Sequence, residues 1–395
     1  MNLQNLGKKI FSVKTDRNFM IITFLGVKLS LRKWYLHWGG IFHLFLKPVM
    51  PDVRPNSILV LEPNTSHGEV IPCYVSYLLD LGYNVDVVVL PDVYYQKPLC
   101  RLNDTRVRCF ALTAKNMRLF LSREDILGQY RNIFITSRIV YPGRHGKHDT
   151  VFDIFPDLQT YKGKIVVAEH HLDLVDEELL KHDKIVTLAN FGLQYGRNIS
   201  VNPHNFGRVS NAPKNGVITK FVIIGSIEPG RRNYRLLTDA LQKLTKIKQG
   251  LFKVTVIGNG ELSDIDEGMR NYFDIKGALD FPEMFEELEQ ADFSLPLLDP
   301  YDQNHDRYLT TGTSGSFQLI YGFVKPCLIN EKFAAYHRFT NHNSLIYKEN
   351  TELVTAMEQA IEMSSREYAE MQRMLEKTSA EIYAESLDVI RRVLR

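Results

Sequence analysis

One pattern recurs along most of this chain: a short apolar run, a turn that holds glycine or polar side chains, and then a stretch with helical periodicity. Residues 57–61 form the first such run, apolar positions recur at helical spacing from Val70 to Leu81, and residues 85–90 form the next run. A strand, a helix and a strand of these lengths make a βαβ unit, which requires a parallel sheet. The pattern therefore predicts an α/β fold.

The pattern divides into two parts, because residues 200–217 are rich in turn-forming residues and have no periodicity. A chain of 395 residues also exceeds one ordinary core. Further strands are expected at 132–136, 164–168, 184–188, 220–224, 253–257, 292–297 and 327–330, with helices at 234–247, 281–290 and 316–321. The expected segments are a basic aromatic segment at 1–47, α/β domains at 48–205 and 216–363, and C-terminal helices at 364–395.

The first segment combines positive charge with aromatic side chains. Residues 1–47 hold eight lysine and arginine residues against one aspartate, and they contain both tryptophans of the chain. This composition is typical of a surface that rests on an anionic membrane. Lys28, Arg32 and Lys33 leave no apolar run long enough to span a bilayer. We expect either peripheral membrane contact or a basic β-hairpin at 20–29 that packs on the protein.

Several observations place the protein in the cytoplasm, on the inner face of the cytoplasmic membrane if the segment binds lipid. The four cysteines lack paired spacing, which fits a reducing compartment. No apolar core with a small-residue cleavage site marks a signal peptide. No basic run continues onto a nucleic-acid-binding module, so nucleic acid is not an expected partner.

The clearest candidate for ligand binding is the turn from Thr311 to Ser316, which precedes a predicted helix. A helix start presents unpaired N–H groups and the positive end of the helix dipole, so it stabilises a phosphate without a metal. Earlier in the same part, Gly225 and Ser226 follow a strand and lead to Arg231 and Arg232, which suit bidentate phosphate contact. The alternatives are an ordinary helix cap and solvated loop arginines.

Polar side chains also follow two strands of the first part. His67 and Glu69 lie in the turn after residues 57–61, and Glu169, His170 and His171 follow residues 164–168. Because the carboxyl ends of parallel strands share one edge, we expect these groups to flank a ligand. His67, Glu69 and His170 are the candidate catalytic residues, as a base toward an acceptor or as contacts to a sugar. The alternative for Glu69 is helix capping, and no third ligand completes a zinc site.

The motifs of the second part, and their order along the chain, resemble those of the nucleotide-sugar glycosyltransferases of the GT-B fold. The resemblance is closest to the retaining family that builds bacterial surface polysaccharides. The matching motifs within residues 216–350 are Gly225 with Arg231, Val256-Ile257-Gly258-Asn259-Gly260, Ile275-Lys276-Gly277-Ala278, Glu289-Gln290-Ala291-Asp292, Leu295-Pro296, the 311–316 turn and Gly322 to Ile329. The resemblance implies two Rossmann-like domains facing a cleft, with C-terminal helices crossing back to the first domain.

The resemblance further implies a hexosyltransferase that moves a sugar from a nucleotide-sugar, expected to be a UDP-sugar, to a glycan or lipid-linked acceptor in capsule, O-antigen or lipopolysaccharide biosynthesis. No cofactor and no metal are expected. The donor-binding candidates are Gly225, Ser226, Arg231, Arg232, Asn259, Gly277, Ala278, Thr313, Ser314, Gly315 and Ser316. A sugar-nucleotide epimerase of the same fold and a non-catalytic partner subunit are the alternatives.

The chain departs from the family at two points. Ser226 replaces a first basic residue near the glycine turn, and the family's paired glutamates have no counterpart near Gly312 and Leu319 or Ile320. Sugar recognition is therefore expected from the polar loop 298–310, through Asp299, Asp302, His305 or Asp306, and the stereochemical outcome of transfer stays open.

Overall fold

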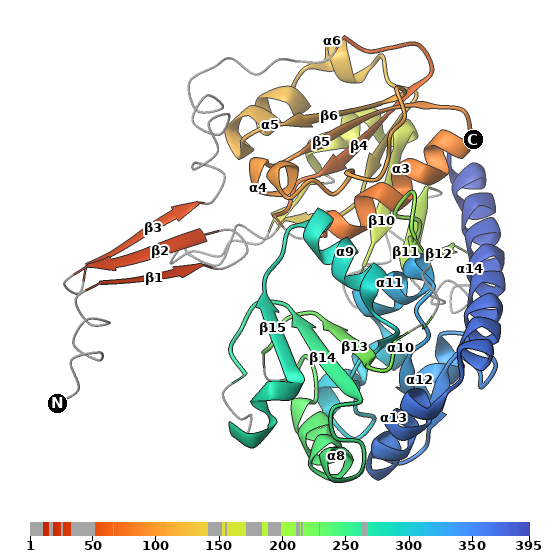
Figure 1. Ribbon diagram of the computed structural model, residues 1–395. Coiled ribbons are helices and arrows are strands. Elements are labelled where there is room, and N and C mark those ends of the chain that lie inside the picture. Colours follow the sequence, from red (N-terminus) through yellow and green to blue (C-terminus); the bar gives the residue numbers. More distant parts are fainter. Residues whose placement is uncertain are drawn as a thin grey trace.

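The computed structural model describes residues 11–15, 19–24, 27–32, 52–65, 67–140, 152–154, 156–170, 184–188, 199–210, 214, 216–228, 230–262 and 267–395. Within these ranges the chain forms two α/β domains, each built on a parallel sheet (Figure 1). The predicted fold class is confirmed. The four-part division of the chain stays a prediction in its boundaries.

The N-terminal domain holds a seven-stranded sheet in the order β12-β11-β10-β7-β4-β5-β6, and every pairing in it is parallel. Its strands are β4 (Ser57–Glu62), β5 (Asn84–Val89), β6 (Val107–Ala111), β7 (Asn132–Ile135), β10 (Ile165–Glu169), β11 (Ile185–Leu188) and β12 (Ser200–Val201). The connecting helices are η2 (Gly68–Val70), α3 (Ile71–Asp80), α4 (Pro91–Tyr95), α5 (Ala114–Leu121), α6 (Glu124–Leu127) and η3 (Pro156–Lys164). A short pair, β8 (Ile139–Val140) and β9 (Phe152–Asp153), lies beside them.

Alternation along β4 explains why this sheet is covered on both faces. Successive side chains of a strand point to opposite faces. Ile58 and Val60 pack into the apolar cluster under α3, whereas Leu59 and Leu61 pack into the cluster under α5 and α6. A strand that is buried on both faces has a continuous run of apolar residues, and the sequence of β4 contains such a run.

The C-terminal domain holds the parallel sheet β15-β14-β13-β16, and a parallel bridge from Ser294 to Cys327 links β16 to the segment before β17. Its strands are β13 (Thr219–Ile224), β14 (Phe252–Ile257), β15 (Phe273–Gly277), β16 (Phe293–Ser294), β17 (Leu328–Asn330) and β18 (Leu345–Tyr347). Its helices are α8 (Tyr234–Ile247), η6 (Glu267–Tyr272), α9 (Phe281–Gln290), η7 (Gln303–His305), α10 (Arg307–Thr310), α11 (Gly315–Phe323), α12 (Glu331–Tyr336), η8 (Asn350–Glu352) and α13 (Leu353–Glu362).

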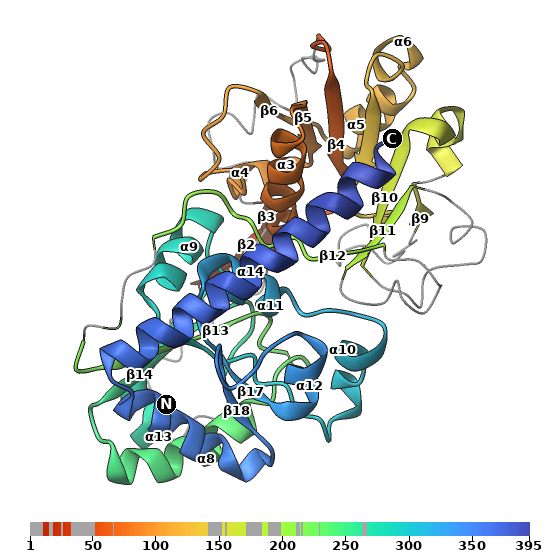
Figure 2. The same ribbon diagram turned by 90° about the vertical axis from the view of Figure 1, so that its right-hand side faces the viewer.

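The last helix, α14 (Ser365–Val393), joins the two domains (Figure 2). It begins at a capping box in which Ser364 and Glu367 exchange hydrogen bonds. Its first turns bury Tyr368 in the C-terminal domain, and its last turns bury Val389 and Ile390 in the core of the N-terminal domain. The expected return of the C-terminal helices to the first domain is confirmed.

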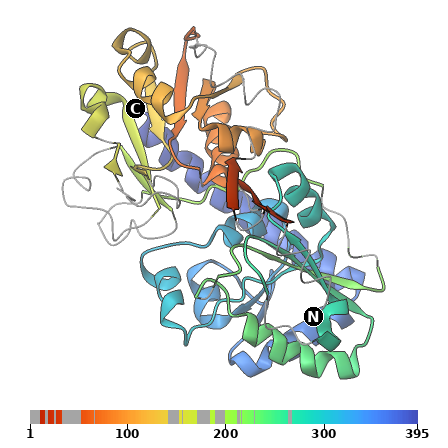
Figure 3. The ribbon, with the colours of Figure 1, turned by 90° about the vertical axis from the view of Figure 1, so that its left-hand side faces the viewer.

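A small antiparallel sheet of β1 (Phe11–Thr15), β2 (Phe19–Phe24) and β3 (Val27–Arg32) stands apart at the left of Figure 1 and faces the viewer in Figure 3. Its β2–β3 pairing is the hairpin expected at 20–29. The side chains of the basic aromatic segment lie outside the described residues, so its membrane contact stays a prediction. No helix in the described ranges is both long enough and apolar enough to cross a membrane.

Candidate functional site

The carboxyl ends of three neighbouring strands in the C-terminal sheet carry glycines that pack against one another. The amide of Gly225 donates to Ile257 O at 2.9 Å, and the amide of Gly258 donates to Gly277 O at 2.9 Å. A Cβ at position 258 would lie 1.7 Å from Gly225 O, so the turn after β14 admits only glycine there. Predicted donor residues from β13, β14 and β15 therefore form one edge.

The side chain of Arg232 lies across this edge. Its Nη2 donates to Ile224 O at 3.0 Å and to the hydroxyl of Ser316 at 2.8 Å, and Ser314 Oγ lies 3.4 Å away. A Cβ at Gly225 would come within 2.8 Å of the same nitrogen. The structure thus brings four of the predicted donor residues, Gly225, Arg232, Ser314 and Ser316, into direct neighbourhood.

Those serines begin α11. Ser314 is the N-cap residue, and its hydroxyl accepts from the Ser316 amide at 3.4 Å. Thr313 precedes the cap and Gly315 is the first helical residue, so the predicted helix start is present. The positive end of the α11 dipole therefore points to the place where Arg232 holds its guanidinium.

The guanidinium of Arg232 and the positive end of the α11 dipole are both positive, so an anion bound between them would be stabilised by both. Arg232 donates its hydrogen bonds to carbonyl and hydroxyl oxygens, and no carboxylate within the described ranges pairs with it. Burial lowers the pKa of Arg232, although an arginine stays charged near neutral pH. A partly buried cation beside a helix N-terminus is stabilised when an anion such as a phosphate joins it.

The other predicted donor residues take supporting positions. Arg231 donates its amide to Glu228 O at 3.1 Å and accepts from Arg232 Nη1 at 2.8 Å through its carbonyl. Ser226 follows Gly225, and the carbonyl of Asn259 accepts from Ile227 at 2.6 Å. Ala278 comes directly after Gly277, which has a left-handed φ of 69°. Arg232 rather than Arg231 is thus the arginine whose guanidinium reaches the serines of the α11 turn.

Several polar side chains of the loop 298–310, which is expected to recognise the sugar, form hydrogen bonds within the C-terminal domain. Asp299 accepts from Asn233 at 2.7 Å, from Asn350 at 2.9 Å and from the Tyr301 amide at 2.9 Å. Its own amide donates to Nδ1 of the buried His305 at 2.8 Å. Asp302 caps η7, and Asp306 precedes α10. These contacts fix Asp299 and His305 within the domain, and sugar recognition by this loop stays a prediction.

In the N-terminal domain, the candidate catalytic residues lie together. His67 adopts a left-handed conformation, with φ of 65° and ψ of 17°, just before η2. Such a conformation is uncommon for a residue with a side chain and clusters at functional sites. His67 Nδ1 lies 3.6 Å from a carboxylate oxygen of Glu69, and its ring centroid lies 4.5 Å from that of His170. His171, the third member of that predicted group, lies outside the described residues.

A second carboxylate, Glu62, completes this group. It is the last residue of β4 and is fully buried. Its oxygens accept from the Asn64 amide and from the hydroxyls of Thr136 and Ser137, each at 2.8 Å. Burial raises the pKa of Glu62 to about 7, although the charge of His67 and these hydrogen bonds act in the opposite direction. Glu62 is not among the residues predicted from the sequence, although an acid at the end of an otherwise apolar strand is a signal that could have revealed it.

Residues after β7 and β10 hold the second histidine. The Thr136 carbonyl accepts from His170 Nε2 at 2.7 Å, and Glu169 accepts from the His170 amide at 3.0 Å. Arg138 and Glu169 form a buried ion pair at 3.2 Å. Thr136 therefore connects Glu62 to His170, which in turn packs against His67.

The His67 turn meets the C-terminal domain. A Cβ at Gly68 would lie 3.0 Å from the ring of Phe281, the first residue of α9, and the Phe281 amide donates to Gln96 O at 3.1 Å. Phe281 follows the segment of Gly277 and Ala278. The turn that carries His67 is thus in contact with the start of α9 in the C-terminal domain. No group of three metal-ligating side chains within the described part of the chain could hold a metal ion.

No protein-family model matches the sequence, and no curated protein matches it. Solved structures do. AviGT4, a glycosyltransferase involved in avilamycin A biosynthesis, is 11% identical with a TM-score of 0.53, and the match covers 86% of this chain and 98% of that one. A T4 phage BGT mutant in complex with UDP-glucose is 14% identical with a TM-score of 0.51, over 86% of this chain and 99% of that one. Together with the two parallel sheets and the returning α14, these matches show that the chain has the GT-B glycosyltransferase fold.

Proposed function

We propose that this protein is a glycosyltransferase that binds a nucleotide-sugar, a UDP-sugar in our proposal, at the edge formed by β13, β14 and the start of α11. The observation that carries the proposal is the guanidinium of Arg232, held at the N-terminus of α11 by Ser316. No described carboxylate neutralises it. A diphosphate supplies the negative charge that this arrangement lacks.

The same arrangement suits the chemistry of sugar transfer. A nucleoside diphosphate gains negative charge as its bond to the sugar breaks. A guanidinium and backbone N–H groups that are already in place stabilise this charge without a reorganisation step. The proposed transfer therefore needs no metal ion.

The fold supports the choice of donor class by analogy alone. The T4 phage structure that shares the fold was solved in complex with UDP-glucose. UDP is therefore the first nucleotide to test, ahead of GDP, dTDP and CMP. The acceptor in our proposal is a glycan or lipid-linked saccharide on the His67 side, and the pathway is the assembly of a bacterial surface polysaccharide.

Membrane contact belongs to the same proposal. The basic residues of segment 1–47 would bring the protein to the inner face of the cytoplasmic membrane, where lipid-linked acceptors lie. Flotation with vesicles of phosphatidylglycerol tests this contact. The wild type is expected to float, and a variant with Lys8, Lys9, Arg32 and Lys33 changed to glutamine is expected to remain in solution.

The central experiment is UDP binding measured by calorimetry, followed by turnover of UDP-sugars. Arg232→Ala removes a charge-assisted contact, which corresponds to a loss of about 10- to 100-fold in UDP affinity. The affinity for uridine is expected to change little, because uridine carries no phosphate. Arg235→Ala, an exposed arginine on α8, is the matched control and should bind UDP as the wild type does.

Two outcomes would contradict the proposal. Equal UDP affinity in the wild type and in Arg232→Ala would contradict the proposed diphosphate site at Arg232. Tight UDP binding without hydrolysis or transfer for any UDP-, GDP-, dTDP- or CMP-sugar would instead indicate a non-catalytic partner subunit.

A further inference from the structure

The two ends of helix α11 contact different parts of the molecule. Its start, at Ser314, is the helix N-terminus that we propose to bind the diphosphate. Its last turn packs against residues 202–207, which join the two domains and are called the linker below. A Cβ at Gly322 would lie 2.2 Å from the carbonyl oxygen of His204 and 2.4 Å from the ring of Phe206. The backbone of α11 therefore lies directly against the linker, with no room for a side chain at position 322.

The linker is also held from the side opposite to α11. The Asn202 amide donates to Ser386 Oγ of α14 at 3.0 Å, and the Asn202 carbonyl accepts from the Tyr77 hydroxyl of α3 at 2.7 Å. His204 Nε2 lies 3.1 Å from the carbonyl oxygen of Ser379, which is also on α14. The start of the linker is thus bonded to both of these helices.

The end of the linker is equally confined. Gly207 has a left-handed φ of 91°, and a Cβ there would lie 2.5 Å from the carbonyl oxygen of Arg101 in the N-terminal domain. Between the two ends, Phe206 is buried in a cluster that contains Cys73 of α3 and Phe323 of α11. The linker therefore has little freedom to move away from α11.

Helix α11 can pass a displacement from one of its ends to the other. Gly315 and Gly322 lie about 10 Å apart along the axis, at about 1.5 Å per residue. The sides of the helix bury Phe317 in one apolar cluster and Leu319 in another. A short helix that is packed on two sides shifts as a unit, because close-packed interiors transmit strain.

We infer that the linker positions the phosphate-binding end of α11, and that Gly322 is the positioning residue that permits their contact. The inference rests on the nucleotide-sugar site proposed above. It makes the affinity for the donor depend on a contact about 10 Å from the start of the helix. The N-terminal domain contributes to donor binding in this way, because α3 and Arg101 hold the linker in place.

Helix propensity alone predicts that Gly322→Ala is favourable, since alanine stabilises a helix more than glycine does. The contact with the linker reverses this expectation. The carbonyl oxygen of His204 belongs to the backbone, so it cannot rotate away from a new Cβ as the end of a long side chain can. Because the linker is held on its other sides, α11 is the element that we expect to move. Such a shift displaces Ser314 and Ser316 relative to Arg232.

The closing experiment measures the affinities for UDP and for uridine by calorimetry, with the full-length protein and well below its Tm. Gly322→Ala is expected to lower the affinity for UDP by about tenfold. The affinity for uridine should stay unchanged, because uridine has no phosphate for α11 to bind. A purely structural role of Gly322 would lower Tm without changing the UDP affinity of the folded protein. Gly163→Ala, whose Cβ would meet nothing within 4 Å, is the control and should bind UDP as the wild type does.

A second substitution tests whether the effect passes through the linker. Phe206→Leu makes room beside the new Cβ. Adding Gly322→Ala to Phe206→Leu should therefore cost less UDP affinity than adding it to the wild type. If Gly322→Ala does not fold, Ser379→Ala replaces it, because Ser379 Oγ donates to Tyr321 O at 3.2 Å near the same end of α11. We expect Ser379→Ala to lower UDP affinity by about twofold or more.

The outcomes separate the inference from the proposed function. Equal UDP affinity in the wild type and in Gly322→Ala overturns the inference, and so does an equal loss for UDP and uridine. Equal affinity in the wild type and in Ser379→Ala overturns it in the same way. A wild type that does not bind UDP contradicts the proposed function itself. UDP binding that is lost in Arg232→Ala but unchanged in Gly322→Ala leaves the proposed function standing and overturns the inference alone.

Discussion

Arg101 Nη2 lies 2.8 Å from a carboxylate oxygen of Glu289, and this contact joins the N-terminal domain to helix α9 of the C-terminal domain. The second guanidinium nitrogen approaches the other carboxylate oxygen at 2.5 Å, so the pair is bidentate. Glu289 also accepts from the amide of Ser210, which follows the last N-terminal strand. The ion pair therefore holds both domains and the segment between them in one geometry.

Arg101→Ala is expected to lower the free energy of unfolding by about 2 to 3 kcal/mol, because it leaves a mostly buried carboxylate without its cation. Urea denaturation measures the loss. Arg373→Ala breaks an exposed pair with Glu370 on α14 and should cost less than about 0.5 kcal/mol. Equal losses for the two variants would show that the inter-domain pair is no stronger than a surface pair.

Gly225→Ala tests whether the position of Arg232 controls donor binding. The new Cβ would lie 2.8 Å from Arg232 Nη2, and the φ of 141° already disfavours any side chain. We expect Arg232 to move and the affinity for UDP to fall by about tenfold or more. Gly250→Ala also places a side chain at a positive φ, of 73°, but with open space around its Cβ. It should lower stability and leave UDP affinity unchanged.

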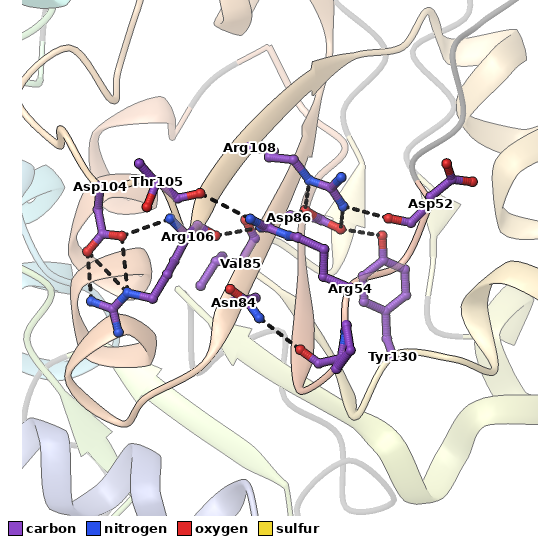
Figure 4. Close-up of polar contacts among 11 residues, drawn as sticks. Asp52, Arg54, Asn84, Val85, Asp86, Asp104, Thr105, Arg106, Arg108 and Tyr130 are labelled. Carbon is purple, nitrogen blue, oxygen red and sulfur yellow. Dashed lines mark hydrogen bonds and ion pairs between the residues drawn. The ribbon is translucent and has the colours of Figure 1, made fainter.

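A buried acid in the N-terminal domain supports the fold at the edge away from the candidate site (Figure 4). Asp86 on β5 accepts from Arg108 at 2.8 Å through both oxygens, from Arg54 at 3.2 Å and from the Tyr130 hydroxyl at 3.0 Å. Asp86→Asn removes the negative charge that two arginines share and should cost about 3 kcal/mol or more. Thermal unfolding measures the melting temperature of this variant and of the control Asp125→Asn. Asp125 belongs to an exposed ion pair, so we expect almost no change in the melting temperature of the control.

Stability should also respond to pH through Glu62. Its pKa is about 7 in the folded protein against 4.5 as the ordinary value, so between these values the folded state binds more protons than the unfolded state. Stability from this group is therefore present below about pH 4.5 and is lost as pH rises through 7, by an amount on the order of 3 kcal/mol. Glu62→Gln removes the dependence.

The comparison is made by urea denaturation between pH 5 and pH 8. Relative to the wild type, Glu62→Gln should gain stability from pH 5 to about pH 7 and level off above it, whereas Glu381→Gln, at an exposed acid of α14, should show a constant difference. A constant difference for Glu62→Gln as well would mean that Glu62 is already ionised at pH 5.

Much of the fold could be predicted because local patterns determine it. The helices at 234–247 and 281–290 coincide with α8 and α9, whose periodic apolar positions face one side. Strand β6 was not predicted, since every one of its residues is only partly buried and its sequence carries arginine and cysteine between apolar residues. Strand β18 was also not predicted.

In the candidate site, too, some features could be predicted from the sequence and others could not. The Ser314 turn could be found from sequence because it consists of adjacent residues with a known cap chemistry. The neighbourhood of His67 and His170 followed from the rule that parallel strands end at one edge, although their contact at 4.5 Å could not be derived. The role of Glu62 depends on Thr136 and Ser137, more than 70 residues away, and burial of this kind is decided only by the sheet order.

Helix α14 gives the last prediction, because one helix contributes to the cores of both domains. Near its start Tyr368 is buried in the C-terminal domain, and near its end, where α14 packs on β11 and β12, Ile390 is buried in the core of the N-terminal domain. Ile390→Ala is expected to cost about 2 to 5 kcal/mol, in the range of large-to-small core substitutions. Arg391→Ala changes the next, exposed residue and should cost less than about 0.5 kcal/mol.

Differential scanning calorimetry of a variant truncated after Glu385 extends this test. Removing residues 386–395 exposes the apolar surface of the N-terminal domain that Val389, Ile390 and Val393 cover. We expect the N-terminal domain to unfold at a lower temperature in a separate transition, while the C-terminal domain keeps its UDP-dependent increase in Tm because its donor residues are intact. A single transition at the wild-type temperature would mean that the end of α14 does not stabilise the N-terminal domain.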